Sequence, residues 1–172
     1  ELSGRPTETT IGLQSRNDVI RNGLYHTVAR ERLSTTRQDD VLQNSIGLFG
    51  ENKTQWAEKF RTVAGVRGDI YHFDVASDND ANSGDNWNAL ASPKGSLIFG
   101  PWSDTEFYLS GGLGFHSNDG RGTTTRVDPG SGDPATPVDA LVRTYGAEVG
   151  VRTTFVPGLQ STLAFWWLDI DS

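Results

Sequence analysis

The feature that most constrains this fold is a strict alternation of side chains over residues 141–155. One face of this stretch carries Tyr145, Ala147, Val149, Val151 and Phe155. The other face carries Thr144, Gly146, Glu148, Gly150, Arg152 and Thr154. Side chains of a β-strand point alternately to opposite sides, so this pattern predicts a long strand with one apolar and one polar face.

The same alternation recurs along the chain and predicts seven strands. They are expected at 9–16, 41–53, 60–75, 92–99, 106–116, 141–155 and 161–170. The connections predicted to be short are 54–59, 100–105 and 156–160, and those predicted to be long and polar are 17–40, 76–91 and 117–140. Short and long connections alternate, which is typical of a membrane-spanning barrel with turns at one end and loops at the other.

Composition excludes several classes of protein. The chain of 172 residues has a net charge of -7, which argues against a nucleic-acid partner because such binding needs clustered Lys and Arg. It contains no cysteine, so neither disulfides nor thiolate metal sites are available. It also lacks the roughly 20 consecutive apolar residues of a membrane helix, although a barrel strand needs only about 9 to 11 residues.

Charged residues indicate which face of each strand meets lipid. An Arg on the lipid side at the middle of the bilayer costs about 2 to 4 kcal/mol. Arg67 and Arg152 should therefore face the lumen, which assigns the opposite faces of their strands to lipid. A soluble β-sandwich produces the same alternation, because its apolar faces pack on a second sheet.

Other features favour the barrel over the sandwich. The short-turn end carries an aromatic belt formed by Trp56, Phe60, Trp102, Phe107 and Phe155, as at a membrane interface. The predicted loops are long at one end only, and the strands exceed the five or six residues usual in globular sheets. These features predict an all-β fold, a portion of an antiparallel transmembrane β-barrel.

Several segments resemble the barrel of TonB-dependent outer-membrane receptors. The most specific is 114–122, which runs from the fifth predicted strand into its loop. The others are 63–71, 92–97, 99–102, 105–109, 145–152 and 164–171. The resemblance implies a barrel of 22 strands in the bacterial outer membrane, of which residues 1–172 supply about seven. The plug domain and the remaining strands are expected to lie outside this chain.

The resemblance further implies a function in nutrient import. Its expected partners are outer-membrane lipid, the plug with the other strands, the TonB energy-transducing complex reached through the plug, and a small-molecule ligand such as a metal chelate. The expected substrate is a ferric siderophore, with no cofactor and no enzymatic activity. Two alternatives remain, a passive porin-type channel and a soluble β-sandwich binding module.

Candidate ligand contacts lie where the fifth predicted strand leaves the membrane. His116, Asn118, Asp119 and Arg121 form a polar run that would face the outer vestibule. Alternatively, this run caps the strand and ties the loop to its neighbours.

A second candidate group faces the lumen and consists of Arg67, Asp69, Tyr71, Glu148 and Arg152. Its charged members could form charge-assisted hydrogen bonds to a plug. They could equally form a ladder of ion pairs between strands in a wet lumen.

No metal or catalytic site is expected. The three histidines lie on separate predicted elements, and none has the spacing of a ligand cluster. The segment 78–85 begins like a calcium loop but lacks the Glu required at position 12.

Overall fold

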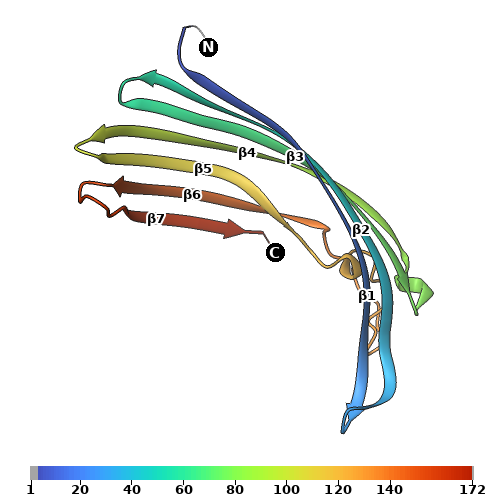
Figure 1. Cartoon of the computed structure of the whole chain (residues 1–172). Helices are drawn as coiled ribbons and strands as arrows, with labels where there is room; N and C mark the ends of the chain where they lie inside the picture. Colours follow the sequence, from blue (N-terminus) through green and yellow to red (C-terminus); the bar gives the residue numbers. More distant parts are fainter. Residues whose placement is uncertain (1–3, 172) are drawn as a thin grey trace.

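The computed structural model describes residues 4–171, so residues 1–3 and 172 of the predicted barrel segment lie outside it. The chain forms one antiparallel sheet of seven strands in sequence order. The strands are β1 (Thr7–Val28), β2 (Glu31–Ala57), β3 (Phe60–Ser77), β4 (Gly84–Trp102), β5 (Thr105–Ser117), β6 (Leu141–Thr153) and β7 (Ser161–Ile170). Figure 1 shows a single curved layer with the two termini on opposite edges.

Two short 3-10 helices complete the described part, η1 (Asp80–Asn82) and η2 (Gly120–Thr123). Within residues 4–171, no helix combines the length and apolar character that crossing a membrane requires.

The sandwich alternative is wrong, because the described residues form no second sheet and the apolar face stays uncovered. Val66, Leu109 and Val149 are 55%, 50% and 52% exposed. Register aligns apolar residues across neighbouring strands, since Leu97 pairs with Leu109, and Leu109 pairs with Val149. The sheet therefore has the shape and exposed apolar face of an incomplete barrel wall.

Polar and aromatic residues bound the apolar face at both ends. At the short-turn end lie the predicted aromatic residues, of which Trp102 and Phe107 pack with ring centroids 6.3 Å apart. Toward the other end, His72 stacks on Trp87 at 4.2 Å, and two residues further the paired carboxylates Asp74 and Asp85 begin the polar region. A band of apolar side chains lies between these limits, as expected of a wall that crosses a membrane.

The prediction of a long loop at 17–40 is wrong, because almost all of this segment is strand. β1 and β2 stay paired from Thr7 to Val28, and only Ala29 and Arg30 turn the chain, both with positive φ. Two such residues give a tight hairpin whose twist matches the strands. The hairpin extends beyond the other strands (Figure 1), because β3 pairs with β2 only as far as Asp39.

The connection predicted at 76–91 is also shorter than expected, since β4 begins at Gly84 and only 78–83 lie between β3 and β4. The connection at 117–140 contains no long strand, as predicted, but it includes η2 and an isolated bridge between Val127 and Pro134. At the opposite end the connections are short, as predicted.

A small core lies at the loop end of the sheet. Its members are Val41, Phe73, Val75, Ala140, Leu141 and Val142, all buried. A single layer cannot bury both faces, so a second layer must cover Phe73, which has no exposed surface. That layer is the 118–140 connection, in which Gly120 packs directly on Phe73. The packing is so close that a Cβ on Gly120 would lie 2.8 Å from Phe73 Cδ1.

Candidate functional site

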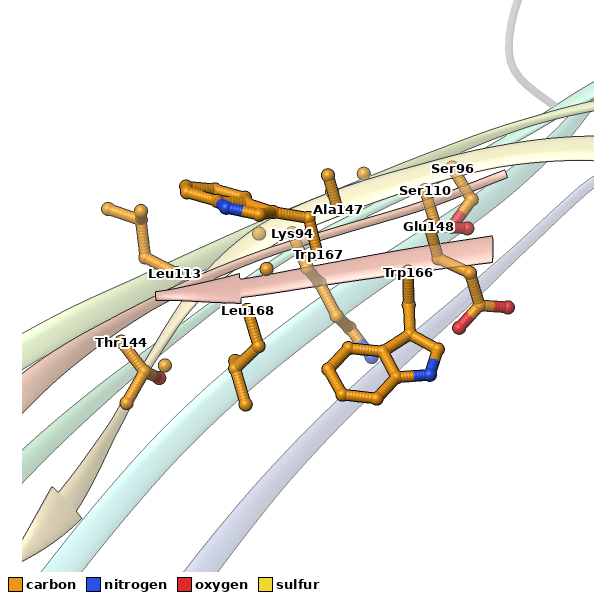
Figure 2. A pocket seen from close by; sticks show the side chains of 15 residues that line it. Lys94, Ser96, Ser110, Leu113, Thr144, Ala147, Glu148, Trp166, Trp167 and Leu168 are labelled. Atoms are coloured by element: carbon orange, nitrogen blue, oxygen red, sulfur yellow. The ribbon is translucent and has the colours of Figure 1, made fainter. Parts of the chain in front are cut away.

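The predicted inner residues share one face of the sheet. Asp69 lies on the face opposite the exposed Ile70, and Glu148 lies opposite Val149, as strand alternation requires. Figure 2 shows Glu148 and Trp166 on one side of the sheet and Ala147 and Trp167 on the other. In β7 both faces carry large apolar side chains, so alternation alone does not assign them. The pairing of Glu148 with Trp166 places Trp166 on the polar face.

Arg67 and Asp69 bond to each other along one strand. The Arg67 guanidinium donates to both carboxylate oxygens of Asp69 at 2.6–2.9 Å, and it also donates to Gln14 Oε1 at 3.0 Å. The Asp69 side chain is 1% exposed, so this pairing satisfies a charge that would otherwise be costly to bury. The ion pair lies within β3, and the hydrogen bond to Gln14 reaches across β2 to β1.

Arg152 belongs to a second network nearer the short turns. Glu106 accepts two hydrogen bonds from Arg61, at 2.7 and 2.9 Å, and a third from Arg152 at 3.0 Å. Glu148 accepts a hydrogen bond of 2.5 Å from the Tyr108 hydroxyl. These bonds connect β3 to β5 across β4, and β5 to its neighbour β6, so the inner charges tie the strands of the wall together.

Tyr71 takes part in an aromatic cluster. Its ring stacks on Phe73 with centroids 6.0 Å apart and meets Phe115 edge-on at 5.7 Å. Strict alternation along 106–116 predicts Phe115 on the lipid face together with Phe107 and Leu109, and the contact with Tyr71 shows that this prediction is wrong. The physical reason is that β5 leaves the sheet before this residue and passes over the polar face.

Of the predicted ligand contacts, Asn118, Asp119 and Arg121 bond within the connection. Asn118 Nδ2 donates to the Asp139 carbonyl at 2.7 Å. Asp119 caps η2 by accepting from the Arg121 amide at 3.0 Å and from the Arg121 guanidinium. The Arg121 guanidinium lowers the pKa of Asp119, and Asp119 in turn raises the pKa of Arg121.

His116 differs from these three residues, because its exposed side chain forms no hydrogen bond to another described residue. Within β5 it pairs with Val142. Its imidazole is therefore free of the bonds to the connection that occupy the other three residues.

Sequence reasoning missed a buried ion pair beside this run. The Asp39 side chain has no exposed surface and accepts from Arg37 Nε at 2.5 Å, while Arg121 Nη1 lies 4.0 Å away. Arg37 also donates to Thr125 Oγ1 at 3.2 Å. Both Asp39 and Arg37 fall in the segment that was predicted to be a loop, where no alternation marked them as inward-facing.

Asn82 is the second residue that sequence reasoning missed. Its side chain is buried, and it accepts from the amides of Arg126 and Val127 at 2.8 and 2.9 Å and donates to the Val127 carbonyl at 2.9 Å. Thr124 Oγ1 donates to the Asn82 carbonyl at 2.8 Å. One amide thus joins the turn after β3 to the connection after β5. No sequence motif indicates that these distant segments meet.

Among the hollows on the polar side of the sheet, two lie beside predicted site residues. One, of about 530 Å³, lies between the β1–β2 hairpin and the 117–140 connection and is lined by Leu24, Arg37, Asp119, Arg121 and Asp128 among others. The second, of about 470 Å³, is an open groove over β4–β7 with a floor of small residues. Lys94, Glu148 and Trp166 line it, as Figure 2 shows.

Metal ligation finds no support in residues 4–171, where no group of three or more His, Asp or Glu side chains has the arrangement of a metal site. The polar face offers hydrogen-bonding side chains around a concave surface, which suits the binding of a ligand.

Comparison with known proteins places this geometry among membrane barrels. Residues 2–172 match the family model described as TonB dependent receptor-like, beta-barrel. The copper transporter OprC has a similar structure, with a TM-score of 0.62 and 15% identity over 93% of this chain and 26% of OprC. The closed form of the ferric-catecholate import receptor Fiu from E. coli K12 gives a TM-score of 0.63 and 15% identity over 96% of this chain and 28% of Fiu. No curated protein matches the chain.

Proposed function

Because this chain belongs to the TonB-dependent receptor-like β-barrel family, we propose that it forms part of the barrel of a receptor that imports a scarce nutrient across the bacterial outer membrane. The observation that carries the proposal is the uncovered apolar band on one face of a single curved sheet. An isolated sheet of this kind leaves two open edges, and in hydrocarbon each unpaired backbone group is costly. The remaining wall and a plug domain are therefore part of the proposal.

The proposed substrate is a metal chelate, most simply a ferric siderophore. Support comes from the two structural neighbours, one named for copper and the other for ferric catecholates. The chain spans only about a quarter of each neighbour, 26% and 28%, so the substrate of the whole protein is inferred from shared fold and family.

The proposed ligand contact is His116, with Asn118, Asp119 and Arg121 positioning the connection that carries it. Support for this division comes from their bonding, because the latter three residues donate to or accept from other groups of the same connection. We likewise propose two roles for Arg67, Asp69, Glu148 and Arg152, of which the main one is to stabilise the wall and the other is to contact the plug. Tyr71 packs against Phe115.

A passive porin is the alternative function. A porin needs neither a plug nor an energy supply, whereas the family match favours a receptor. Uptake of a radiolabelled ferric siderophore by cells carrying the complete protein separates the two. The receptor proposal predicts saturable uptake that stops when the inner-membrane energy supply is removed. Uptake that continues without it would establish the porin instead.

A further inference from the structure

The pairing between β4 and β5 stops halfway along the sheet. It runs from Trp102 opposite Thr105 to Lys94 opposite Gly112, and no pair follows. β4 continues to Gly84 paired with β3 alone, and β5 continues to Ser117 paired with β6 alone. Figure 1 shows β5 bending away from β4. The wall therefore parts above Lys94 and Gly112.

Two residues at the parting point explain why the ladder ends there. Pro93 has no backbone N–H and cannot donate to a neighbouring strand. On the other strand, a Cβ at Gly112 would lie 3.0 Å from the Pro93 carbonyl oxygen and 3.2 Å from Lys94 Cα. Backbone atoms cannot move aside as a flexible side chain can, so this approach requires glycine.

β6 pairs with β7 as far as Thr144 opposite Ile170, and beyond that pair residues 115–143 form a unit that we name the outer hairpin. It consists of the end of β5, the 118–140 connection and the start of β6. The outer hairpin lies on the polar face, where Phe115 meets Tyr71. A Cβ on Gly120 would lie 3.1 Å from Val41 Cγ1 on β2. Asn82 fastens the outer hairpin to the turn after β3.

The sequence of the outer hairpin also fits a position within the wall. If β4 and β5 stayed paired beyond Lys94 and Gly112 in the same register, Ala91 would lie opposite Phe115 and Leu90 opposite His116. In that position Phe115 and Ala91 would extend the apolar band, because both have the parity of the exposed Leu97 and Leu109. The same residues thus suit two arrangements, one folded inward and one in the wall.

Opposing costs balance the two arrangements. Folding inward leaves one edge of β4 without a strand partner, and between Trp87 and Pro93 this edge lies within the apolar band, where unpaired backbone groups are costly. It also buries Phe73 and Val75, which the bare polar face would expose to water. Bistable elements of this kind underlie switching in many proteins.

We propose that the outer hairpin is a movable section of the barrel wall, hinged at Pro93 and Gly112, that alternates between the inward position and a position paired with β4. In the inward position it narrows the outer mouth of the lumen. The outer hairpin carries His116, so its movement also moves the proposed ligand contact. Only this last consequence rests on the proposed import function.

Disulfide trapping in the complete protein, in outer membranes without added ligand, tests the proposal. These 172 residues contain no cysteine, so any disulfide within them comes from the introduced pair. The pair Val41→Cys with Gly120→Cys traps the inward position, and the pair Leu90→Cys with His116→Cys traps the wall position. Gly95→Cys with Gly111→Cys is a positive control, since these residues pair in the constant part of the ladder. Ile70→Cys with His116→Cys is a negative control, because Ile70 lies on the other face.

The proposal predicts that both trapping pairs form a disulfide and that the negative control does not. If only one of the two trapping pairs forms, the outer hairpin has a single position and the proposal is wrong. Because no ligand is present, either result is independent of uptake, which tests the import function separately.

The hinge has its own test. Gly112→Val should abolish trapping by Val41→Cys with Gly120→Cys and leave trapping by Leu90→Cys with His116→Cys intact. Gly111→Val is the matched control, because a Cβ there meets its nearest neighbour at an ordinary 3.5 Å. Equal trapping in both valine variants would overturn the hinge assignment.

Discussion

The half of the sheet near the short turns and the half near the long connections differ in strand pairing and in side-chain alternation. In the first half every strand pairs with its neighbours and side chains alternate between an exposed apolar face and a polar face. In the second half β4 and β5 part, the β1–β2 hairpin extends alone, and a connection folds over the polar face. Lipid on one side enforces alternation, whereas a segment with water on both sides escapes this constraint.

The largest effect should come from placing charge on the apolar face. Val149→Arg should cost about 2 to 4 kcal/mol of folding free energy in the membrane, because Val149 lies in the apolar band. Ser110→Arg is the control, since Ser110 pairs with Glu148 on the polar face and its cation would gain a partner. The measurement is the yield of folded barrel in outer membranes. Equal yields would mean that the two faces are assigned wrongly.

A smaller effect is expected from loosening the loop end of the sheet. Asn82→Ala removes the buried amide that holds 126 and 127, at a cost of about 1 to 3 kcal/mol. Proteases should then cut within 118–139 faster than in the unchanged protein. Asn79→Ala provides the comparison, because Asn79 only caps η1 at the surface. Unchanged cleavage in Asn82→Ala would mean that the connection is held in another way.

In the half near the short turns, Glu106→Gln should weaken the ties between β3, β5 and β6. The change removes the charge that accepts two hydrogen bonds from Arg61 and one from Arg152. The expected loss is about 1 kcal/mol, since such pairs near water contribute modestly. Thermal unfolding in detergent at low and high salt measures it. A loss that does not shrink with salt would argue against an electrostatic cause.

The smallest effect is expected on the stability of the 118–139 connection at acidic pH. Arg121 holds the pKa of Asp119 below its usual value, so this carboxylate stabilises the folded connection above the unfolded pKa of about 4. That contribution is lost as the pH falls through the lowered pKa of the folded state. Protease cleavage within 118–139 should therefore stay constant from neutral pH to about pH 4 and rise below it. Asp119→Asn should remove this rise.

Sequence reasoning succeeded where lipid dictates the pattern. It predicted β7 at its observed bounds, Ser161–Ile170, and β5 to within one residue at each end. It also placed Arg67 and Glu148 on the polar face. In β5 one face must be apolar, so its pattern is legible without coordinates, whereas β7 carries Trp166 and Leu168 on the polar face and only its bounds could be predicted.

It failed where water reaches both faces. Val19 and Ile20 are adjacent, apolar and both exposed, at 75% and 41%, so their segment showed no alternation although it is strand. The contacts of Asn82 with Val127 and of Asp39 with Arg121 join residues far apart in sequence. No local signal marks such pairs, because they depend on how the outer hairpin folds onto the sheet.

The most direct test of the account is a cysteine scan of residues 144–152 in the complete protein in lipid bilayers, each site carrying a fluorophore. Brominated lipid should quench the odd positions, including Val149, and a water-soluble quencher should reach the even ones, including Glu148. Quenching that follows no period of two would contradict the placement of lipid on one face and water on the other.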